Sequence, residues 1–149
     1  MKIAGRQYYI FRLDEDVKIS TKRIKHKESW QSDKFHIFIE NETTNITVKN
    51  GYEWDGCTPK FHLFDIVFGI PDGVPNPKTN KPKAYFASCV HDILYEHAHI
   101  LPSQITRKIA DQIFYDELKK ANFAPAKIYY FGVRVFGWLW WRKSLSKKT

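Results

Sequence analysis

The chain has 149 residues, of which 43% are apolar and 16% aromatic, and its 24 basic and 16 acidic side chains give a formal net charge of +8. A chain of this size and composition can bury a core, which excludes intrinsic disorder as a description of the whole. From the length of the chain we expect one domain over residues 1–149. No run reaches the roughly 18–20 apolar residues of a membrane-spanning helix, and the first residues lack a secretory signal, so we expect the protein to be made in the cytosol.

Residues 1–56 are predicted to be mainly β. Apolar side chains recur at strand-like spacing in Tyr8–Leu13, Phe35–Glu40 and Ile46–Trp54. The segment Asn41–Asn45 consists of polar turn residues, so the second and third runs should form an antiparallel hairpin. The segment Ser20–Lys34 is polar and charged, and we expect it to be a long exposed loop.

Residues 57–83 are predicted to be a long loop. Five of the seven prolines of the chain lie in this segment. Proline lacks a backbone donor and restricts the residue before it, so neither a helix nor a central strand can run through Pro71–Pro82. Loops of this length are usually functional or disordered, and the apolar residues between Phe61 and Ile70 argue against disorder in the first half.

Three helices are predicted in residues 84–142, followed by a basic tail in residues 143–149. The first covers Ala84–His97 and has one apolar arc. The second begins after Ser103 as N-cap and runs to about Asn122, and the third opens at Pro125 and runs to about Arg142. The predicted fold class is therefore α+β, with an N-terminal antiparallel sheet, a proline-rich loop and three C-terminal helices.

The net charge lies entirely in the C-terminal part. Residues 1–118 hold 16 basic and 16 acidic side chains, whereas residues 119–149 hold eight basic and no acidic ones. The segment Ile128–Trp141 is apolar on nearly all sides, so it is either a core helix that closes the domain or a surface for lipid or an assembly partner. In the second case Trp138, Trp140 and Trp141 would be exposed. A basic tail also binds nucleic acid, but no DNA-binding motif accompanies it, and we do not expect that partner.

His91 and Asp111 are the candidate chemical pair. The short connection between the first two helices makes them antiparallel neighbours. At 1.5 Å per residue, His91 and Asp111 fall roughly 9 and 12 Å from the turn, which is level within the reach of a side chain. A carboxylate bonded to one imidazole nitrogen fixes the tautomer and leaves the other nitrogen as a base. A buried hydrogen bond that only joins the two helices is equally open.

Asp92 points about 100° away from His91 and is available as a hard oxygen ligand. The turn Asp55–Thr58 contains a glycine and could bring backbone carbonyls and the Asp55 carboxylate to the same cation, a ligand set that Ca²⁺ prefers.

Three other readings of the same residues are weaker. A metal phosphohydrolase would need His62, which lies in the proline-rich loop. A zinc cluster would need His97, which lies on the apolar arc, together with His91 and His99. Cys89 as a nucleophile with His91 fails because residues i and i+2 point apart on a helix.

Three motifs together resemble the phospholipase A2 superfamily. They are Asp-Gly-Cys-Thr at Asp55–Thr58, Cys-Val-His-Asp-Ile-Leu-Tyr at Cys89–Tyr95 and Ala-Asp-Gln-Ile-Phe at Ala110–Phe114. The pattern is similar to the bacterial and fungal branch and to the parvovirus capsid domain. It also resembles a family of short uncharacterised phage and prophage proteins, which share an aromatic-Gly segment like Phe131–Gly137. The resemblance covers roughly residues 51–140.

The resemblance implies a Ca²⁺-dependent ester hydrolase site. His91 would be the general base on water, Asp111 its orienter, and Tyr95 would bond to Asp111. The calcium ligands would be Asp92, the backbone around Asp55, Gly56 and Cys57, and the Asp55 carboxylate. In the secreted enzymes the helix cysteine lies three residues before the histidine, whereas Cys89 lies two before His91, which argues against a Cys57–Cys89 bridge.

Two functions follow from these patterns. One is a phage-type protein, in the host cytoplasm or the virion, that hydrolyses or binds phospholipid at an anionic membrane surface. The other is a non-enzymatic virion or accessory protein that contacts phage structural proteins, with His91–Asp111 as a stabilising pair.

Overall fold

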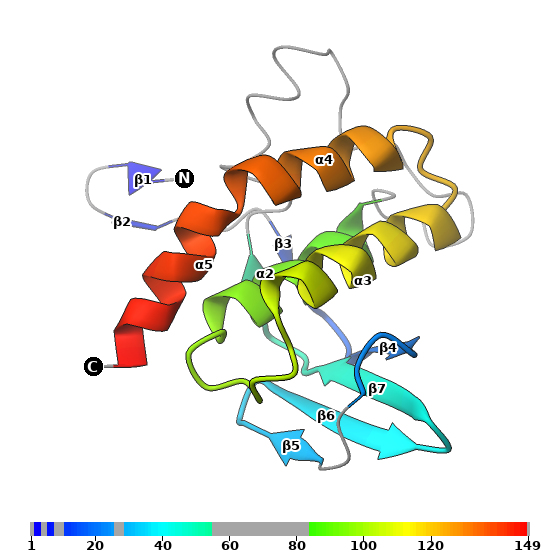
Figure 1. The fold of residues 1–149 in the computed structure, drawn as a ribbon. Helices are drawn as coiled ribbons and strands as arrows, with labels where there is room; N and C mark the ends of the chain where they lie inside the picture. Colours follow the sequence, from blue (N-terminus) through cyan, green and yellow to red (C-terminus); the bar gives the residue numbers. More distant parts are fainter. Residues whose placement is uncertain (1, 4–5, 8–10, 26–28, 55–83, 149) are drawn as a thin grey trace.

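The computed structural model describes residues 2–3, 6–7, 11–25, 29–54 and 84–148. Strands occupy the N-terminal half of these residues and helices the C-terminal part, so the α+β prediction is confirmed (Figure 1). The proline-rich segment 57–83 and the predicted calcium-loop residues Asp55, Gly56 and Cys57 lie outside the described residues. Within the described part of the chain, no helix has the length and apolarity needed to cross a membrane.

The main sheet is antiparallel and has four strands. In spatial order they are β4 (Val17–Thr21), β7 (Thr43–Val48), β6 (Phe35–Glu40) and β5 (Trp30–Gln31). Glu40 pairs with Thr43, so the turn of the β6–β7 hairpin is Asn41-Glu42, and both turn residues have positive φ, at 49° and 64°. That is the backbone of a tight type I′ turn. The predicted hairpin is confirmed, with a turn shorter than the expected Asn41–Asn45.

The prediction of a loop over Ser20–Lys34 is wrong at both ends. β4 extends to Thr21, and its residues alternate between buried and exposed, with Val17, Ile19 and Thr21 facing the core. At the other end Trp30 pairs with Ile37 across β5 and β6. Both strands lie at the edges of the sheet, where short strands with one polar face need few apolar residues. Because the residues around these strands are charged, the sequence pattern did not predict the strands.

Two smaller ladders complete the β part. β3 (Phe11–Arg12) pairs with β8 (Glu53–Trp54), and β1 (Lys2–Ile3) pairs with β2 (Arg6–Gln7). The ladder of β3 and β8 joins the sheet to the first helix, because the buried Trp54 donates from Nε1 to Ser88 Oγ at 3.0 Å.

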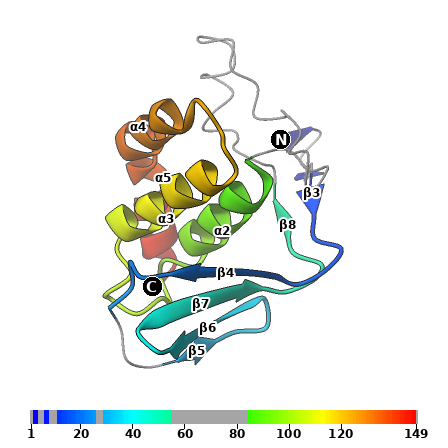
Figure 2. The ribbon, with the colours of Figure 1, turned by 90° about the vertical axis from the view of Figure 1, so that its right-hand side faces the viewer.

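The helices form two layers on one side of the main sheet. α2 (Tyr85–Glu96) and α3 (Arg107–Lys120) lie side by side over the sheet, and α4 (Ala126–Phe136) lies beyond them on the side away from it (Figure 2). α5 (Trp138–Leu145) returns to pack on α2, and a single 3₁₀ turn, η1 (Ser146–Lys148), follows. The predicted first helix is confirmed to within one residue at each end.

The second helix begins later than predicted. Its N-cap is Thr106, whose side chain accepts a hydrogen bond from the Ile109 amide at 3.3 Å, whereas Ser103 is exposed in the preceding connection. The Ile105 amide donates to the Pro102 carbonyl at 2.9 Å, and Ile105 is buried. Residues 102–105 therefore form a separate turn that inserts Ile105 into the core, and the helix starts only after it.

The predicted third helix is two helices that meet at Gly137. A Cβ at this position would overlap the Val133 carbonyl oxygen and lie 2.5 Å from the Tyr95 hydroxyl, so glycine permits the close approach to α2. Beyond Gly137 the chain changes direction (Figure 1). Trp141 then packs on Tyr95 with ring centroids 5.2 Å apart, and Ser144 Oγ donates to the Glu96 carbonyl at 2.9 Å.

The core has two clusters. One lies between the sheet and the α2–α3 pair and includes Phe35, Ile46 and Ile93. The other joins α2, α3 and α4 through five large side chains and three alanines; the large ones are Phe114, Leu118, Phe123, Tyr129 and Val133. Because His91 contacts Phe114 and its helix also supports the sheet cluster, the candidate site lies where the two clusters meet.

Candidate active site

α2 and α3 bring His91, Tyr95 and Asp111 into direct contact. His91 Nε2 lies 2.8 Å from Asp111 Oδ1, and the Tyr95 hydroxyl donates to the same oxygen at 2.5 Å. His91 and Tyr95 are four residues apart on α2 and therefore face α3 together. The predicted contact between His91 and Asp111 is confirmed, as is the bond from Tyr95.

The cluster is closed to solvent in this structure. The side chains of His91 and Asp111 are 1% and 0% exposed. The imidazole packs between Tyr95 and Phe114, with ring centroids 4.2 and 4.7 Å away. Such burial makes the hydrogen bonds of Asp111 strong, because water does not compete for its oxygens.

Two arginines complete the surroundings of Asp111. Arg134 from α4 donates to Asp111 Oδ2 at 2.7 Å, and Arg107 lies 3.5 Å from the same oxygen. Arg107 also donates to the carbonyls of Val133 and Arg134, at 3.2 and 3.1 Å, and so satisfies acceptors in the last turn of α4. The Asp111 carboxylate, on α3, thus links α2, α3 and α4.

Sequence reasoning did not identify either arginine. The position of Arg107 four residues before Asp111 on one helix is a recognisable signal for an ion pair. The approach of Arg134 has no such local signal, because it depends on how α4 packs across the other two helices.

The charge of Asp111 determines the tautomer of the histidine. Burial alone would raise the pKa of Asp111, but hydrogen bonds from His91, Tyr95 and Arg134 outweigh it and leave the pKa below its ordinary value. An ionised carboxylate only accepts hydrogen bonds, so Nε2 of His91 carries a proton. In the neutral ring, Nδ1 is then the nitrogen that can take up a proton.

Tyr95 serves as a donor throughout the physiological range. Its burial, and then the nearby Asp111 charge, raise the pKa of the Tyr95 hydroxyl well above its ordinary value. The hydroxyl therefore remains protonated and keeps its bond to Asp111.

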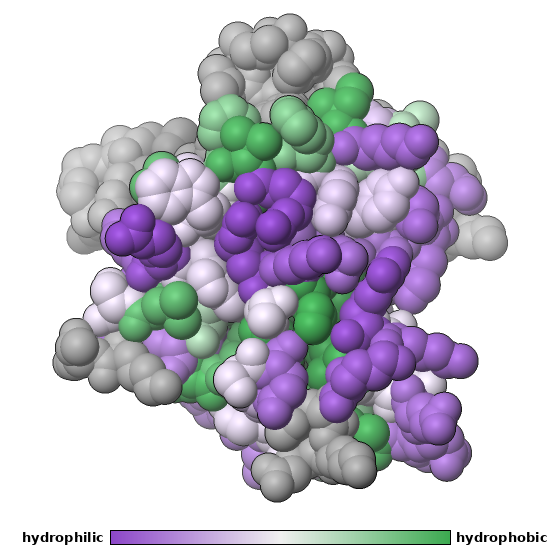
Figure 3. Space-filling view, in the orientation of Figure 1, coloured by the Kyte–Doolittle hydropathy of each residue, from purple (hydrophilic) through white to green (hydrophobic). Residues whose placement is uncertain are grey.

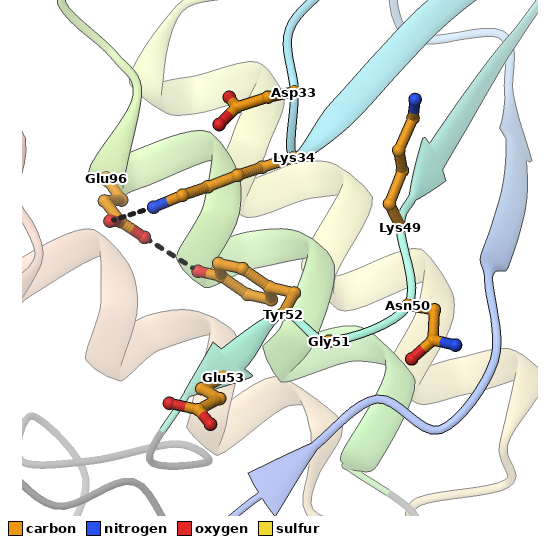
Figure 4. A pocket seen from close by; sticks show the side chains of 8 residues that line it. All are labelled: Asp33, Lys34, Lys49, Asn50, Gly51, Tyr52, Glu53 and Glu96. Carbon is orange, nitrogen blue, oxygen red and sulfur yellow. Dashed lines mark hydrogen bonds and ion pairs between the residues drawn. The ribbon is translucent and has the colours of Figure 1, made fainter.

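The other acidic residues of α2 face away from this cluster. Asp92 and Glu96 lie on the flank towards Tyr52, whose pKa is raised by burial first and then by these two carboxylates. A hollow of about 340 Å³ opens beside this flank, and in it Glu96 accepts a bond from Tyr52 at 3.0 Å and pairs with Lys34 at 3.6 Å (Figure 4). The role of Asp92 as a calcium ligand stays a prediction.

Cys89 is a free and fully buried thiol. Burial raises its pKa, and the Asp92 carboxylate adds to the effect, so the thiol stays protonated at neutral pH. These conditions are opposite to those that activate a cysteine nucleophile. The other cysteine of the chain, Cys57, lies outside the described residues.

The alternative zinc cluster of His91, His97 and His99 is wrong. Among residues that the structure describes, no group of three or more His, Cys, Asp or Glu side chains is arranged to hold a metal. His97 points into the core, where Nδ1 lies 3.0 Å from the Ile93 carbonyl and the ring packs on Phe35. The alternative that uses His62 falls outside the described residues.

Comparisons with known proteins give one match. The model of a protein family described as "Protein of unknown function (DUF1353)" matches residues 30–133, a range that contains α2, α3, most of α4 and the strands from β5 to β8. No curated protein and no solved structure gives a significant match.

Proposed function

Because the chain belongs to the DUF1353 family, whose function is unknown, we propose its function from the site itself: Ca²⁺-dependent hydrolysis of phospholipid esters by a phospholipase A2-like His–Asp pair. The observation that carries this proposal is the shared oxygen of Asp111, which receives both His91 Nε2 and the Tyr95 hydroxyl. That arrangement is what the resemblance to phospholipases implies for these three residues.

The residues of the cluster support a base mechanism. With the Nε2 proton held by Asp111, His91 would act as the base through Nδ1 and take a proton from a water that attacks an ester carbonyl. The imidazolium that forms is stabilised by the carboxylate. Tyr95 and Arg134 keep that carboxylate in place, because they occupy its two oxygens from opposite helices.

The donor set of the chain suits calcium. Asp92 follows His91 in the sequence and supplies one carboxylate, and the resemblance adds the Asp55 carboxylate and the backbone around Gly56 and Cys57. Oxygen donors of this kind are those that Ca²⁺ prefers. When bound, the ion would polarise the ester carbonyl and stabilise the negative charge that develops on its oxygen.

Fatty-acid release from phospholipid vesicles tests the proposal. The wild type should release fatty acid in Ca²⁺ and lose this activity in excess chelator. His91→Gln keeps an amide donor for Asp111 but removes the base, so it should stay folded by circular dichroism and release no fatty acid. Phe38→Ser, at an exposed position of β6, is the matched control and should retain activity. Absence of release from the wild type at any Ca²⁺ concentration would refute the enzyme.

The burial of His91 favours a second candidate function. A histidine that is 1% exposed and bonded to a fully buried carboxylate is also what a purely stabilising pair looks like. In this case the protein is a non-enzymatic phage virion or accessory protein, in line with the resemblance to short phage proteins, and its partners are phage structural proteins.

Fatty-acid release by the wild type separates the two candidates. A purely stabilising pair predicts no release from the wild type or from His91→Gln, with most of the thermal stability kept in His91→Gln and a strongly lowered melting temperature in His91→Ala. Co-purification of the protein with phage particles, followed by immunoblotting, tests the virion association directly.

A further inference from the structure

α4 and α5 carry most of the exposed large apolar side chains of the described residues, together with exposed basic ones. The exposed apolar side chains, which we call the α4–α5 face, are Ile128, Phe131, Val135, Phe136, Trp138, Leu139 and Leu145. Phe131 is 65% exposed and Leu139 53% exposed, more than any other large apolar side chain of the described residues. Figure 3 shows apolar atoms over α4 with hydrophilic side chains next to them. Exposed apolar area gathered on one face marks an interaction surface.

The spacing on α4 shows that this face is separate from the core. Ile128, Phe131 and Val135 follow at i, i+3 and i+7, which places them on one arc. The opposite arc is occupied, since Tyr129 and Val133 are buried. The hydrogen bond from Arg134 to Asp111 also anchors α4 to α3. Rotation of α4 cannot bury the exposed arc without removing Tyr129 and Val133 from the core.

The structure revises which aromatic residues form the surface. Trp140 and Trp141, which would be exposed if the whole segment were a surface, are partly buried and pack against the core. Trp138 is exposed, and the Arg142 guanidinium lies over its ring at 5.4 Å from the centroid. An aromatic ring beside a cation is typical of the level at which a membrane surface changes from apolar to charged.

Charge decides between a lipid and a protein partner. The same part of the chain exposes four basic side chains, Lys127, Arg142, Lys143 and Lys147, and Arg142 contacts Trp138 of the face. Residues 119–149 contain no acidic side chain. At protein–protein interfaces, the buried core is depleted of charged residues and lysine is depleted as a whole. Amphipathic helices at anionic membranes instead combine an apolar face with lysine and arginine on the polar face.

We propose that the α4–α5 face docks on an anionic phospholipid bilayer, with the apolar side chains in the acyl boundary and the basic side chains among the headgroups. This surface is distinct from the His91–Asp111 cluster, and the proposal holds whether or not that cluster hydrolyses esters. Binding should fall as salt rises, because part of it is electrostatic.

Flotation with vesicles tests the surface. The wild type should float with vesicles of equal phosphatidylcholine and phosphatidylglycerol and not with pure phosphatidylcholine. Phe131→Ser should weaken this binding about tenfold, because it removes a buried apolar side chain from the bound state. Phe38→Ser is the matched control, since Phe38 is exposed on β6, and should bind within about twofold of the wild type. Both variants should keep the wild-type melting temperature.

The remaining outcomes contradict the proposal. No flotation of the wild type, or equal binding by the two serine variants, would show that the face does not meet lipid. A dimer in light scattering without lipid, dissolved by Phe131→Ser, would assign the face to a second copy of the chain. His91→Gln should float like the wild type, so a failure of the hydrolysis assay leaves the result for this surface intact.

Discussion

Asp111 forms hydrogen bonds or ion pairs with four side chains. Among the residues of the site, its substitution should therefore lower the free energy of unfolding the most. Asp111→Asn removes the charge that balances Arg107 and Arg134 and should lower the free energy of unfolding by about 3 kcal/mol. Asp116→Asn is the matched control, because its partner Arg23 is 42% exposed and surface pairs contribute at most about 1 kcal/mol. Denaturant titrations of both variants measure the difference, and equal losses would contradict a central role for Asp111.

The lowered pKa of Asp111 should make the free energy of unfolding depend on pH. The folded chain holds the pKa of Asp111 below its ordinary value, despite burial, because His91, Tyr95 and Arg134 donate to the carboxylate. The unfolded chain therefore takes up this proton at higher pH than the folded chain does. The stabilisation is present above about pH 4 and is lost as pH falls through the folded pKa. The difference in stability between wild type and Asp111→Asn should shrink below about pH 4; a difference that stays constant would exclude this linkage.

The residues of the site differ in how far the sequence could predict them. The pairing of His91 with Asp111 follows from helix geometry, because the rise per residue and a short connection place the two level with one another. The bond from Tyr95 is expected only from the resemblance to phospholipases. The contact of Arg134 follows from neither, since its bond to Asp111 requires the crossing of α4 over α3, which side-chain packing along both helices determines. The roles of Asp55, Gly56 and Cys57 stay predictions.

At the scale of elements, the start of α3 gives a sharp comparison between two capping residues. Thr106 accepts a bond from the Ile109 amide, whereas Ser103, which has the same chemistry, lies outside the helix. Thr106→Ala should lower the free energy of unfolding by about 1 kcal/mol. Ser103→Ala should leave it within about 0.5 kcal/mol, as for an ordinary surface position. Chemical denaturation measures the free energy of unfolding of both variants. A larger loss for Ser103→Ala than for Thr106→Ala would show that Ser103 is the N-cap, as the sequence predicted.

The bend between α4 and α5 reverses the usual effect of a glycine substitution. In a helix interior, alanine is favoured over glycine by about 1 kcal/mol. At Gly137 the added methyl group would meet the Val133 carbonyl and the Tyr95 hydroxyl, so Gly137→Ala should instead destabilise by about 2 kcal/mol. Leu139→Ala, on the exposed side of α5, is the control and should change little. Thermal unfolding of both compares them; a rise in melting temperature for Gly137→Ala would contradict the close approach.

The elements that the sequence missed have two physical causes, a weak local pattern and a contact between distant segments. β4 alternates correctly, with Val17, Ile19 and Thr21 inward, but three inward residues beside charged neighbours give a weak signal. The break at Gly137 is also not local, because Tyr95 on α2 is what requires glycine there. By contrast, the β6–β7 hairpin and α2 were predictable, since each carries its full pattern within one continuous segment.

For the whole molecule, the position of the charge matters more than its sum. The balanced part through residue 118 contains the sheet, α2 and nearly all of α3, whereas the unbalanced part contains α4, α5 and the face that they expose. A tail deletion at Ser144 would not isolate this charge, because Ser144 is buried and bonded to the Glu96 carbonyl. Exposed lysines on either side of the molecule offer a cleaner comparison.

Two double variants that remove the same charge should therefore differ in membrane binding. Lys143→Gln/Lys147→Gln removes two charges beside the α4–α5 face, and Lys18→Gln/Lys22→Gln removes two from exposed positions in and just after β4. Each lysine near an anionic surface contributes about 1 kcal/mol, so the first variant should bind phosphatidylglycerol vesicles roughly 30-fold more weakly. The second should bind within about twofold of the wild type, because β4 lies in the sheet and α2 and α3 separate the sheet from α4 (Figure 2), so we expect screening beyond the Debye length of about 8 Å to remove its effect. Equal losses in vesicle flotation would mean that net charge alone drives the binding, and that no particular face of the molecule meets the membrane.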